Sequence, residues 1–172
     1  MAILERSDVG DGWAHGRVGN VVFLYYKASA PNEALERSFG LVDRTIAMHP
    51  KGIALVAIFG ERVRVPSAPL LRRVVDHLQK NAEQMLIGCT VLEGDGMSAA
   101  VKRGAVNLVL TLAGPPYPHR LVRSPAIACD FVAPRAIDDS GAPLGQGALF
   151  VAVTALRPRA SLPEQELGSA SL

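Results

Sequence analysis

The chain has 172 residues, of which 49% are hydrophobic and 20% charged, which is typical of a folded domain and excludes an intrinsically disordered chain. Its net charge of +2, with Lys and Arg spread along the chain, does not favour nucleic acid as a partner. No apolar run approaches the roughly 20 residues of a membrane helix, so membrane insertion is not expected. The N-terminus lacks the apolar core of a signal peptide, and the expected location is the cytoplasm.

The first predicted elements form a β-hairpin that follows a loose arm at residues 1–12. Residues 13–18 are a candidate short strand, and Gly19 with Asn20 is typical of a turn. Residues 21–27 (VVFLYYK) are rich in branched and aromatic side chains, which predicts the second strand of the hairpin.

Two amphipathic helices with a strand between them follow the hairpin. Ser29 is a good N-cap and Pro31 suits a first turn, which predicts a helix from residue 30 that ends near Pro50. The uncharged residues 53–59 (IALVAIF) predict a buried strand, and Ser67-Ala68-Pro69 repeats the helix-start signal. The apolar stripes are Leu35, Phe39, Val42 and Ile46 on the first helix and Leu71, Val74, Val75, Leu78, Ala82 and Met85 on the second.

The centre of the chain is a predicted strand, turn and helix. Residues 86–92 form an apolar run that suits a strand buried on both faces, and Gly94-Asp95-Gly96 breaks it. Ser98 can cap a helix. Residues 99–112 are apolar almost all round, which predicts a largely buried helix.

The last third of the chain alternates breaks with short elements. Residues 114–118 (GPPYP) cannot be helical, and residues 120–123 are a candidate edge strand. Ser124 begins a short helix that ends before Pro134.

Beyond these elements, residues 138–147 (DDSGAPLGQG) have the composition of a flexible linker. Residues 148–156 are apolar, and period alone leaves them open as strand or helix. We expect them to dock on the domain or on a second copy, because so apolar a run is a liability in water. Residues 157–172 are expected to be a frayed tail.

Together the elements predict an α/β fold, with a mixed sheet that opens with a β-hairpin and about four helices. Right-handed connections would place the strands at 53–59 and 86–92 side by side and parallel. Cys89 and Cys129 lie in apolar surroundings, so we expect two reduced core residues rather than a disulfide.

The order of these elements resembles that of STAS domains, and two runs resemble SpoIIAA-like members of that family. These are LEGDGMSAAVKRGAVNLVL and YPHRLVRSPAIACDFVAP. The resemblance covers a domain at residues 13–137 and leaves 138–172 as linker and C-terminal extension. It implies a non-enzymatic regulatory or scaffold module of a bacterial cytoplasm that acts by contact with a protein partner, and self-association is left open.

Ser67 is at the place where signalling STAS domains carry a phosphorylated serine. The resemblance implies a phosphoacceptor, and a phosphate there would lie on a helix N-terminus near Arg62 and Arg64. However, the Asp before and the Gly after the family's serine are absent here. A plain N-cap is the favoured alternative for Ser67.

Two loops should emerge together at the carboxyl ends of the parallel strands, where open α/β sheets bind ligands. They define a candidate surface for a protein partner or an anion. The alternative is that these residues form two ordinary capped helices with solvated arginines. A small-molecule or lipid-binding pocket at this end of the sheet is the alternative function. The surface consists of Arg62, Arg64, Gly94, Asp95, Gly96 and Ser98.

The sequence contains no catalytic or metal-binding motif that would indicate an enzyme. The histidines at 15, 49, 77 and 119 are scattered without ligand spacing, and no GxSxG nucleophile turn occurs. His77 is expected to be solvated, and His119 is expected in a loop. We therefore expect no cofactor, no metal and no catalytic residue.

Overall fold

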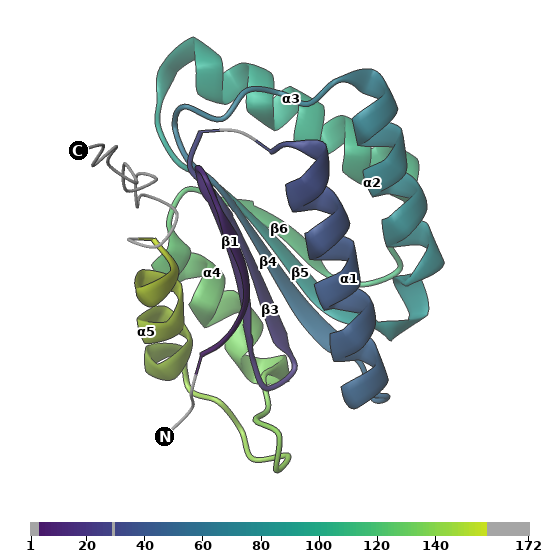
Figure 1. Cartoon of the computed structure of the whole chain (residues 1–172), viewed down its shortest axis with the longest axis vertical. Coiled ribbons are helices and arrows are strands. Elements are labelled where there is room, and N and C mark those ends of the chain that lie inside the picture. The colour runs from purple at the N-terminus through teal and green to yellow at the C-terminus, as the bar shows by residue number, and fades with distance from the viewer. Residues whose placement is uncertain (1–3, 29, 158–172) are drawn as a thin grey trace, which may run out of the picture.

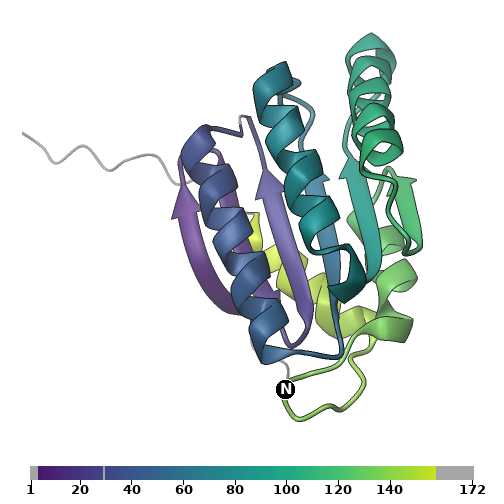
Figure 2. The same cartoon turned by 90° about the vertical axis from the view of Figure 1, so that its right-hand side faces the viewer.

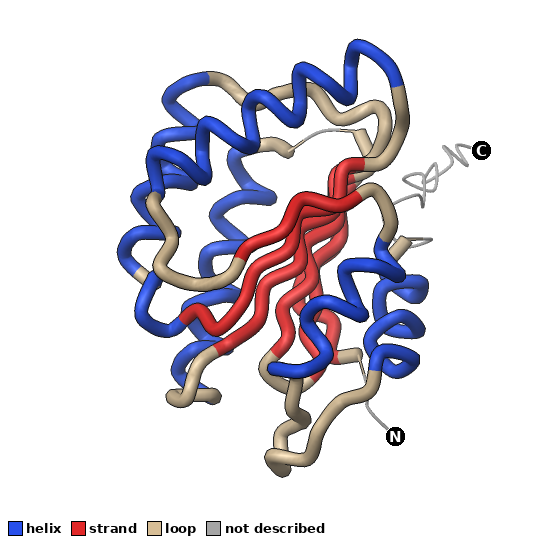
Figure 3. Tube along the Cα trace, turned by 180° about the vertical axis from the view of Figure 1, so that it is seen from behind, coloured by secondary structure: helices blue, strands red, loops and turns tan. Residues whose placement is uncertain are grey.

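A six-stranded mixed sheet lies between two layers of helices in the computed structural model, which describes residues 4–28 and 30–157 (Figures 1 and 3). The strands are β1 (Glu5–Gly10), β2 (Trp13–Val18), β3 (Val21–Tyr26), β4 (Ile53–Phe59), β5 (Met85–Leu92) and β6 (His119–Val122). The helices are α1 (Asn32–Met48), α2 (Ala68–Lys80), α3 (Gly96–Ala113), α4 (Pro125–Val132) and α5 (Gln146–Leu156), with short 3-10 turns at Ala82–Gln84 and Ala133–Arg135.

The strands follow one another across the sheet in chain order. The pairs β1–β2 and β2–β3 are antiparallel, whereas β3–β4, β4–β5 and β5–β6 are parallel. Because each parallel connection advances in the same direction, right-handed crossovers place α1, α2 and α3 on the same face (Figure 2). Helices α4 and α5 cover the opposite face. The predicted α/β mixed sheet with its opening hairpin is confirmed.

Alternation along the strands divides the core into two faces. In β4, Ala54, Val56 and Ile58 point toward α4 and α5, while Leu55 points toward α1. Cys89 and Cys129 are buried as free thiols on the α4–α5 face, as expected for reduced core cysteines. Burial raises the pKa of the Cys89 thiol to about 12 and that of Cys129 to about 11, so both stay protonated.

The N-terminal segment is a strand where the sequence predicted a loose arm. Residues Glu5–Gly10 pair with β2, and the Trp13 ring covers Gly10 so closely that a Cβ there would lie 2.3 Å from it. The prediction was wrong because Val9 is the one strongly β-forming residue in this segment, so its sequence does not indicate a strand. Hydrogen bonds to β2 stabilise the strand instead.

Helix α3 is not buried all round, which corrects the sequence-based prediction. Met97, Val101, Leu108 and Leu112 are exposed on its outer side, and Met97 is 85% exposed. Val109 and Ala113 are buried against α2. The helix is too apolar for its pattern to specify an inward face, and packing against α2 selected one.

Several predicted boundaries also shift. Helix α3 begins at Gly96 with Asp95 as its N-cap, so Ser98 lies inside the first turn and is not the cap. Helix α2 ends at Lys80, and Met85 begins β5 instead of extending the helical stripe. Ser124 caps α4 as predicted and accepts a hydrogen bond from the Ala126 amide at 3.2 Å. The predicted cap at Ser29 lies outside the described residues.

The segment predicted as a linker is largely exposed but is tied to the domain, and the helix that follows it packs on the sheet. Ile137 bridges to Pro143, Leu144 is buried, and α5 contributes Leu149 and Leu156 to the core beside β2. Docking of residues 148–156 is confirmed, and they form a fifth helix. The predicted frayed tail lies outside the described residues except for Arg157. No helix in the described part of the chain has the length and apolar character to cross a membrane.

Candidate functional site

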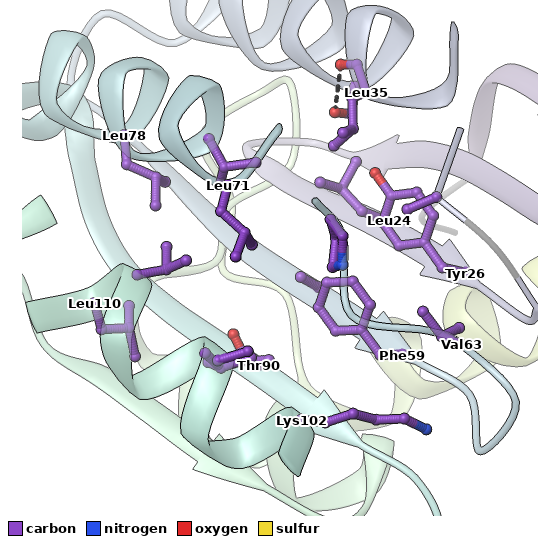
Figure 4. A pocket seen from close by; sticks show the side chains of 18 of the residues that line it. Leu24, Tyr26, Leu35, Phe59, Val63, Leu71, Leu78, Thr90, Lys102 and Leu110 are labelled. Atoms are coloured by element: carbon purple, nitrogen blue, oxygen red, sulfur yellow. Dashed lines mark hydrogen bonds between the residues drawn. The ribbon is translucent and has the colours of Figure 1, made fainter. Parts of the chain in front are cut away.

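An apolar pocket of about 150 Å³ lies between the sheet and the layer formed by α1, α2 and α3 (Figure 4). Its floor consists of three neighbouring strands, β3, β4 and β5. These contribute Leu24 and Tyr26 from β3, Leu55, Ala57 and Phe59 from β4, and Thr90 and Leu92 from β5. The helices close the pocket with apolar side chains: Leu35, Phe39 and Val42 of α1, Leu71, Val74 and Leu78 of α2, and Ala105, Val106, Val109 and Leu110 of α3.

The pocket exists because α2 and α3 pack mainly on each other. Val75, Val109 and Ala113 form a small core between these helices that is separate from the core on the sheet. Beneath them, Ala57 on the central strand β4 is too short to fill the space. Ala57 is therefore only partly buried, although its strand lies in the middle of the sheet with helices on both sides.

A threonine and a histidine form a polar pair at the edge of this floor. Thr90 Oγ1 lies 3.1 Å from His119 Nε2. The ring of His119 lies close to β5 because residue 88 is glycine: a Cβ there would be 2.5 Å from Nδ1. Burial lowers the pKa of His119 to about 4, so the ring is neutral near pH 7. His119 begins β6, which corrects its prediction as a loop residue.

Two polar atoms of the pocket residues are buried without a hydrogen-bond partner in the described part of the chain: the Tyr26 hydroxyl and His119 Nδ1. Burial raises the pKa of Tyr26 above its usual range, which the nearby Ser38 hydroxyl opposes. Ser38 itself donates to the carbonyl of Leu35 at 2.7 Å. Buried polar groups are normally hydrogen-bonded, so these two atoms are exceptions within the wall of the pocket.

Lys102 of α3 ties that helix to the loop after β4. It is only 6% exposed, and its ammonium donates to the carbonyl of Gly60 at 3.1 Å and to that of Glu61. Figure 4 shows the ammonium at the margin of the pocket, pointing away from Thr90 and Leu110. The aliphatic part of the side chain lines the pocket, while the ammonium group is hydrogen-bonded to the loop carbonyls.

The mouth of the pocket includes the segment from Val63 to Pro66. Val63 is buried in the core on this face, whereas Arg64 and Val65 are exposed. Among the described residues, Arg64 has no ion-pair partner. Arg64 is therefore an exposed, positively charged residue of the pocket wall whose guanidinium is not held by an ion pair to a described residue.

His77 is a half-buried pocket residue, which corrects its prediction as a solvated one. Its ring stacks on Phe39 with centroids 4.1 Å apart, and Nε2 lies 3.2 Å from Asn81 Nδ2 and 3.6 Å from Asp43 Oδ1. Burial lowers the pKa of His77, and the Asp43 carboxylate opposes this shift. The ring extends the aromatic wall of the pocket on the α1 side.

The residues predicted as a partner or anion surface lie on two loops that do meet. A Cβ on Gly94 would lie 2.7 Å from Glu61 Cγ, which brings the turn after β5 against the loop after β4. Yet Asp95 pairs with Arg123 at 3.6 Å. Arg62, Arg64 and Ser67 are exposed, while Gly96 and Ser98 belong to the first turn of α3.

Ser67 is at the N-cap position of α2, as predicted. Its side chain, however, makes no capping hydrogen bond within the described structure.

In the described residues, no group of three or more His, Cys, Asp or Glu side chains is arranged to hold a metal ion.

Comparison of the chain with models of known protein families, with curated proteins and with solved structures finds no significant match. The resemblance to STAS domains stays a prediction from element order and motif.

Sequence reasoning missed the residues that define the pocket. Ala57, Thr90 and Lys102 lie within runs that read as buried strand or helix, and nothing in their spacing distinguishes a cavity wall from core. Gly88 and His119 form a contact across 31 positions, which sequence alone does not reveal. One signal was present: Lys102 is a charge in the nearly uncharged stretch that became α3, and such a residue needs partners if it is buried.

Proposed function

We propose that this protein is a binding protein for a small, mainly apolar molecule that occupies the pocket beneath α2 and α3. The observation that carries this proposal is the apolar cavity of about 150 Å³ over the central strands. A cavity of similar volume in another protein's apolar core binds benzene. Such pockets with a few polar groups are the usual form of small-molecule sites.

Binding is better supported than catalysis. Thr90 and His119 have the spacing of a nucleophile and base, but a working pair needs a third group that orients the second ring nitrogen. Within the described residues, Nδ1 of His119 has no such partner. With its pKa lowered to about 4, His119 is also a weak base at neutral pH.

The test uses toluene and 1-hexanol as probes, with thermal unfolding and calorimetry as readouts. A tenfold excess over Kd should stabilise the protein by about 1.4 kcal/mol, which raises Tm by about 3–6 °C. Ala57→Leu and Ala105→Leu fill the pocket and should weaken binding roughly tenfold or more.

Ala100→Leu is the matched control, because Ala100 lies exposed on α3, the same helix as Ala105. It should bind both probes like the wild type. The proposal fails if neither probe binds the wild type, or if the pocket-filling variants bind as well as Ala100→Leu.

The second candidate is a regulatory or scaffold module of the bacterial cytoplasm that acts by contact with a protein. The exposed and positively charged stretch with Arg62 and Arg64, beside the turn at Gly94, favours an acidic partner. The two candidates differ in one respect. Ala57→Leu would leave capture of a protein partner unchanged, whereas Arg62→Glu with Arg64→Glu would abolish it.

A further inference from the structure

Charge is distributed unevenly around the pocket, and this asymmetry indicates which class of ligand it takes. We infer that the ligand is an amphipathic monocarboxylate whose apolar tail lies in the pocket and whose carboxylate pairs with Arg64 at the mouth. This inference rests on the proposed function. The tail has about six carbon atoms, since a cavity of this volume holds benzene.

The pocket has two strongly basic side chains in its wall, and they differ in their hydrogen-bond and ion-pair partners. Lys102 is buried and donates to the carbonyls of Gly60 and Glu61. Arg64 is exposed, and its guanidinium has no ion pair to any described residue. Arg64 therefore retains its donors for a molecule that enters, and the planar guanidinium matches a carboxylate with two parallel hydrogen bonds.

Two acidic side chains of the turn after β5 pair with arginines other than Arg64. Glu93 pairs with Arg157, and Asp95 pairs with Arg123 at 3.6 Å. The Glu61 side chain packs against the turn at Gly94. The loop carries Glu61, Arg62 and Arg64, so its positive charge exceeds its negative charge, and this local excess attracts anions.

The backbone that carries Arg64 is held in place before any ligand arrives. The amide of Val63 donates to the carbonyl of Gly60 at 3.2 Å, and the Val63 side chain is buried. Lys102 fixes the carbonyls of Gly60 and Glu61 from the other side. Because this backbone is fixed, a ligand loses less free energy in ordering the loop when it binds.

The interior of the pocket directs the charged end outward. Its polar groups are the neutral His119 ring, the hydroxyls of Thr90, Tyr26 and Ser38, and the ring of His77. Burial lowers the pKa of His77, which disfavours a positive charge there as well. A carboxylate placed among the leucine and valine side chains would lose its hydration without a charged partner. The favourable orientation therefore has the tail inside and the carboxylate beside Arg64, with Val65 as an apolar rim.

The experiment measures Kd by calorimetry for hexanoate and 1-hexanol, which have the same number of carbon atoms and differ in charge. Octanoate and 1-octanol serve as a second pair. Wild type should prefer the carboxylate by about two- to fivefold, because an exposed ion pair is screened by water. Added salt should reduce the preference. In Arg64→Gln the ratio of the two Kd values should fall to about one.

Arg62→Gln is the matched control, since Arg62 carries the same charge two residues away and does not line the pocket. It should keep the wild-type ratio. Equal or tighter binding of the alcohols by wild type overturns the monocarboxylate and leaves the proposed function intact. A ratio that falls in Arg62→Gln and persists in Arg64→Gln overturns the role of Arg64. If none of the four probes binds wild type, this inference fails, and the proposed function fails with it only if toluene does not bind either.

Discussion

His15 on β2 is a fully buried ionisable residue under α1. Its ring lies between Trp13 at 4.7 Å and Tyr26 at 5.3 Å, measured between ring centroids. Neither ring nitrogen has a hydrogen-bond partner among the described residues. Burial lowers the pKa of His15 from 6.5 to about 3, so the folded protein holds it neutral.

This burial predicts acid sensitivity. Between pH 6.5 and about 3 the unfolded chain binds a proton at residue 15 that the folded protein refuses, so stability falls as the pH falls. The loss is about 1.4 kcal/mol per pH unit for this residue. His15→Phe should make urea unfolding less dependent on pH between 7 and 4.5. His119 retains its own contribution, so the slope should decrease without vanishing. An unchanged slope would contradict the burial of a neutral His15.

Helix α5 shows how one element completes the core on its face of the sheet. Leu149 and Leu156 are fully buried, and a Cβ on Gly16 of β2 would lie 3.4 Å from Leu156, so the helix lies close to this strand. The connection before α5 is secured by Asp139, which pairs with the buried Arg17 at 2.7 Å.

We expect Leu149→Ala to lower the free energy of unfolding by about 2–5 kcal/mol, because it leaves a cavity in a packed core. Val151→Ala is the control on the same helix: Val151 is 69% exposed, and its loss should change stability by about 0.5 kcal/mol or less. Urea unfolding of both variants measures the difference. Equal stabilities would mean that α5 does not pack as described.

At the scale of the whole molecule, the two helical layers differ in how they are held. Helices α4 and α5 share one continuous core with four strands of the sheet, whereas α2 and α3 share a small core of their own above the pocket. Figure 2 shows α1, α2 and α3 side by side over the strands. Fewer buried contacts hold α2 and α3 to the sheet, which lowers the free energy of their local opening.

Hydrogen exchange should therefore proceed in two stages. The amides of α2 and α3 are expected to exchange before those of β3, β4 and β5, and saturating 1-hexanol should slow exchange in α2 and α3 most. Mass spectrometry of peptides from each element measures both effects. Simultaneous exchange of both helices and the sheet would show that the pocket layer is as stable as the core.

The sequence by itself determined the elements whose signals are local. The strands predicted at 21–27, 53–59 and 86–92 follow from apolar runs of β-formers and match β3, β4 and β5 to within one residue at each end, and the helix that starts at Pro125 follows from Ser124 as its cap. The right-handed preference of β-α-β connections then predicted that β4 and β5 are parallel neighbours, as the structure has them. The meeting of the two loops at Glu61 and Gly94 followed from the same topology.

Only the tertiary structure decided which apolar surfaces meet. The pattern of α3 is apolar on most sides, so it could not specify that Val109 faces α2 while Leu108 faces water. A cavity is a mismatch in volume between elements far apart in the chain, and no local pattern records it. For the same reason, the close approach of His119 to Gly88 and the place of Arg64 at the mouth became visible only when the helices were packed on the sheet.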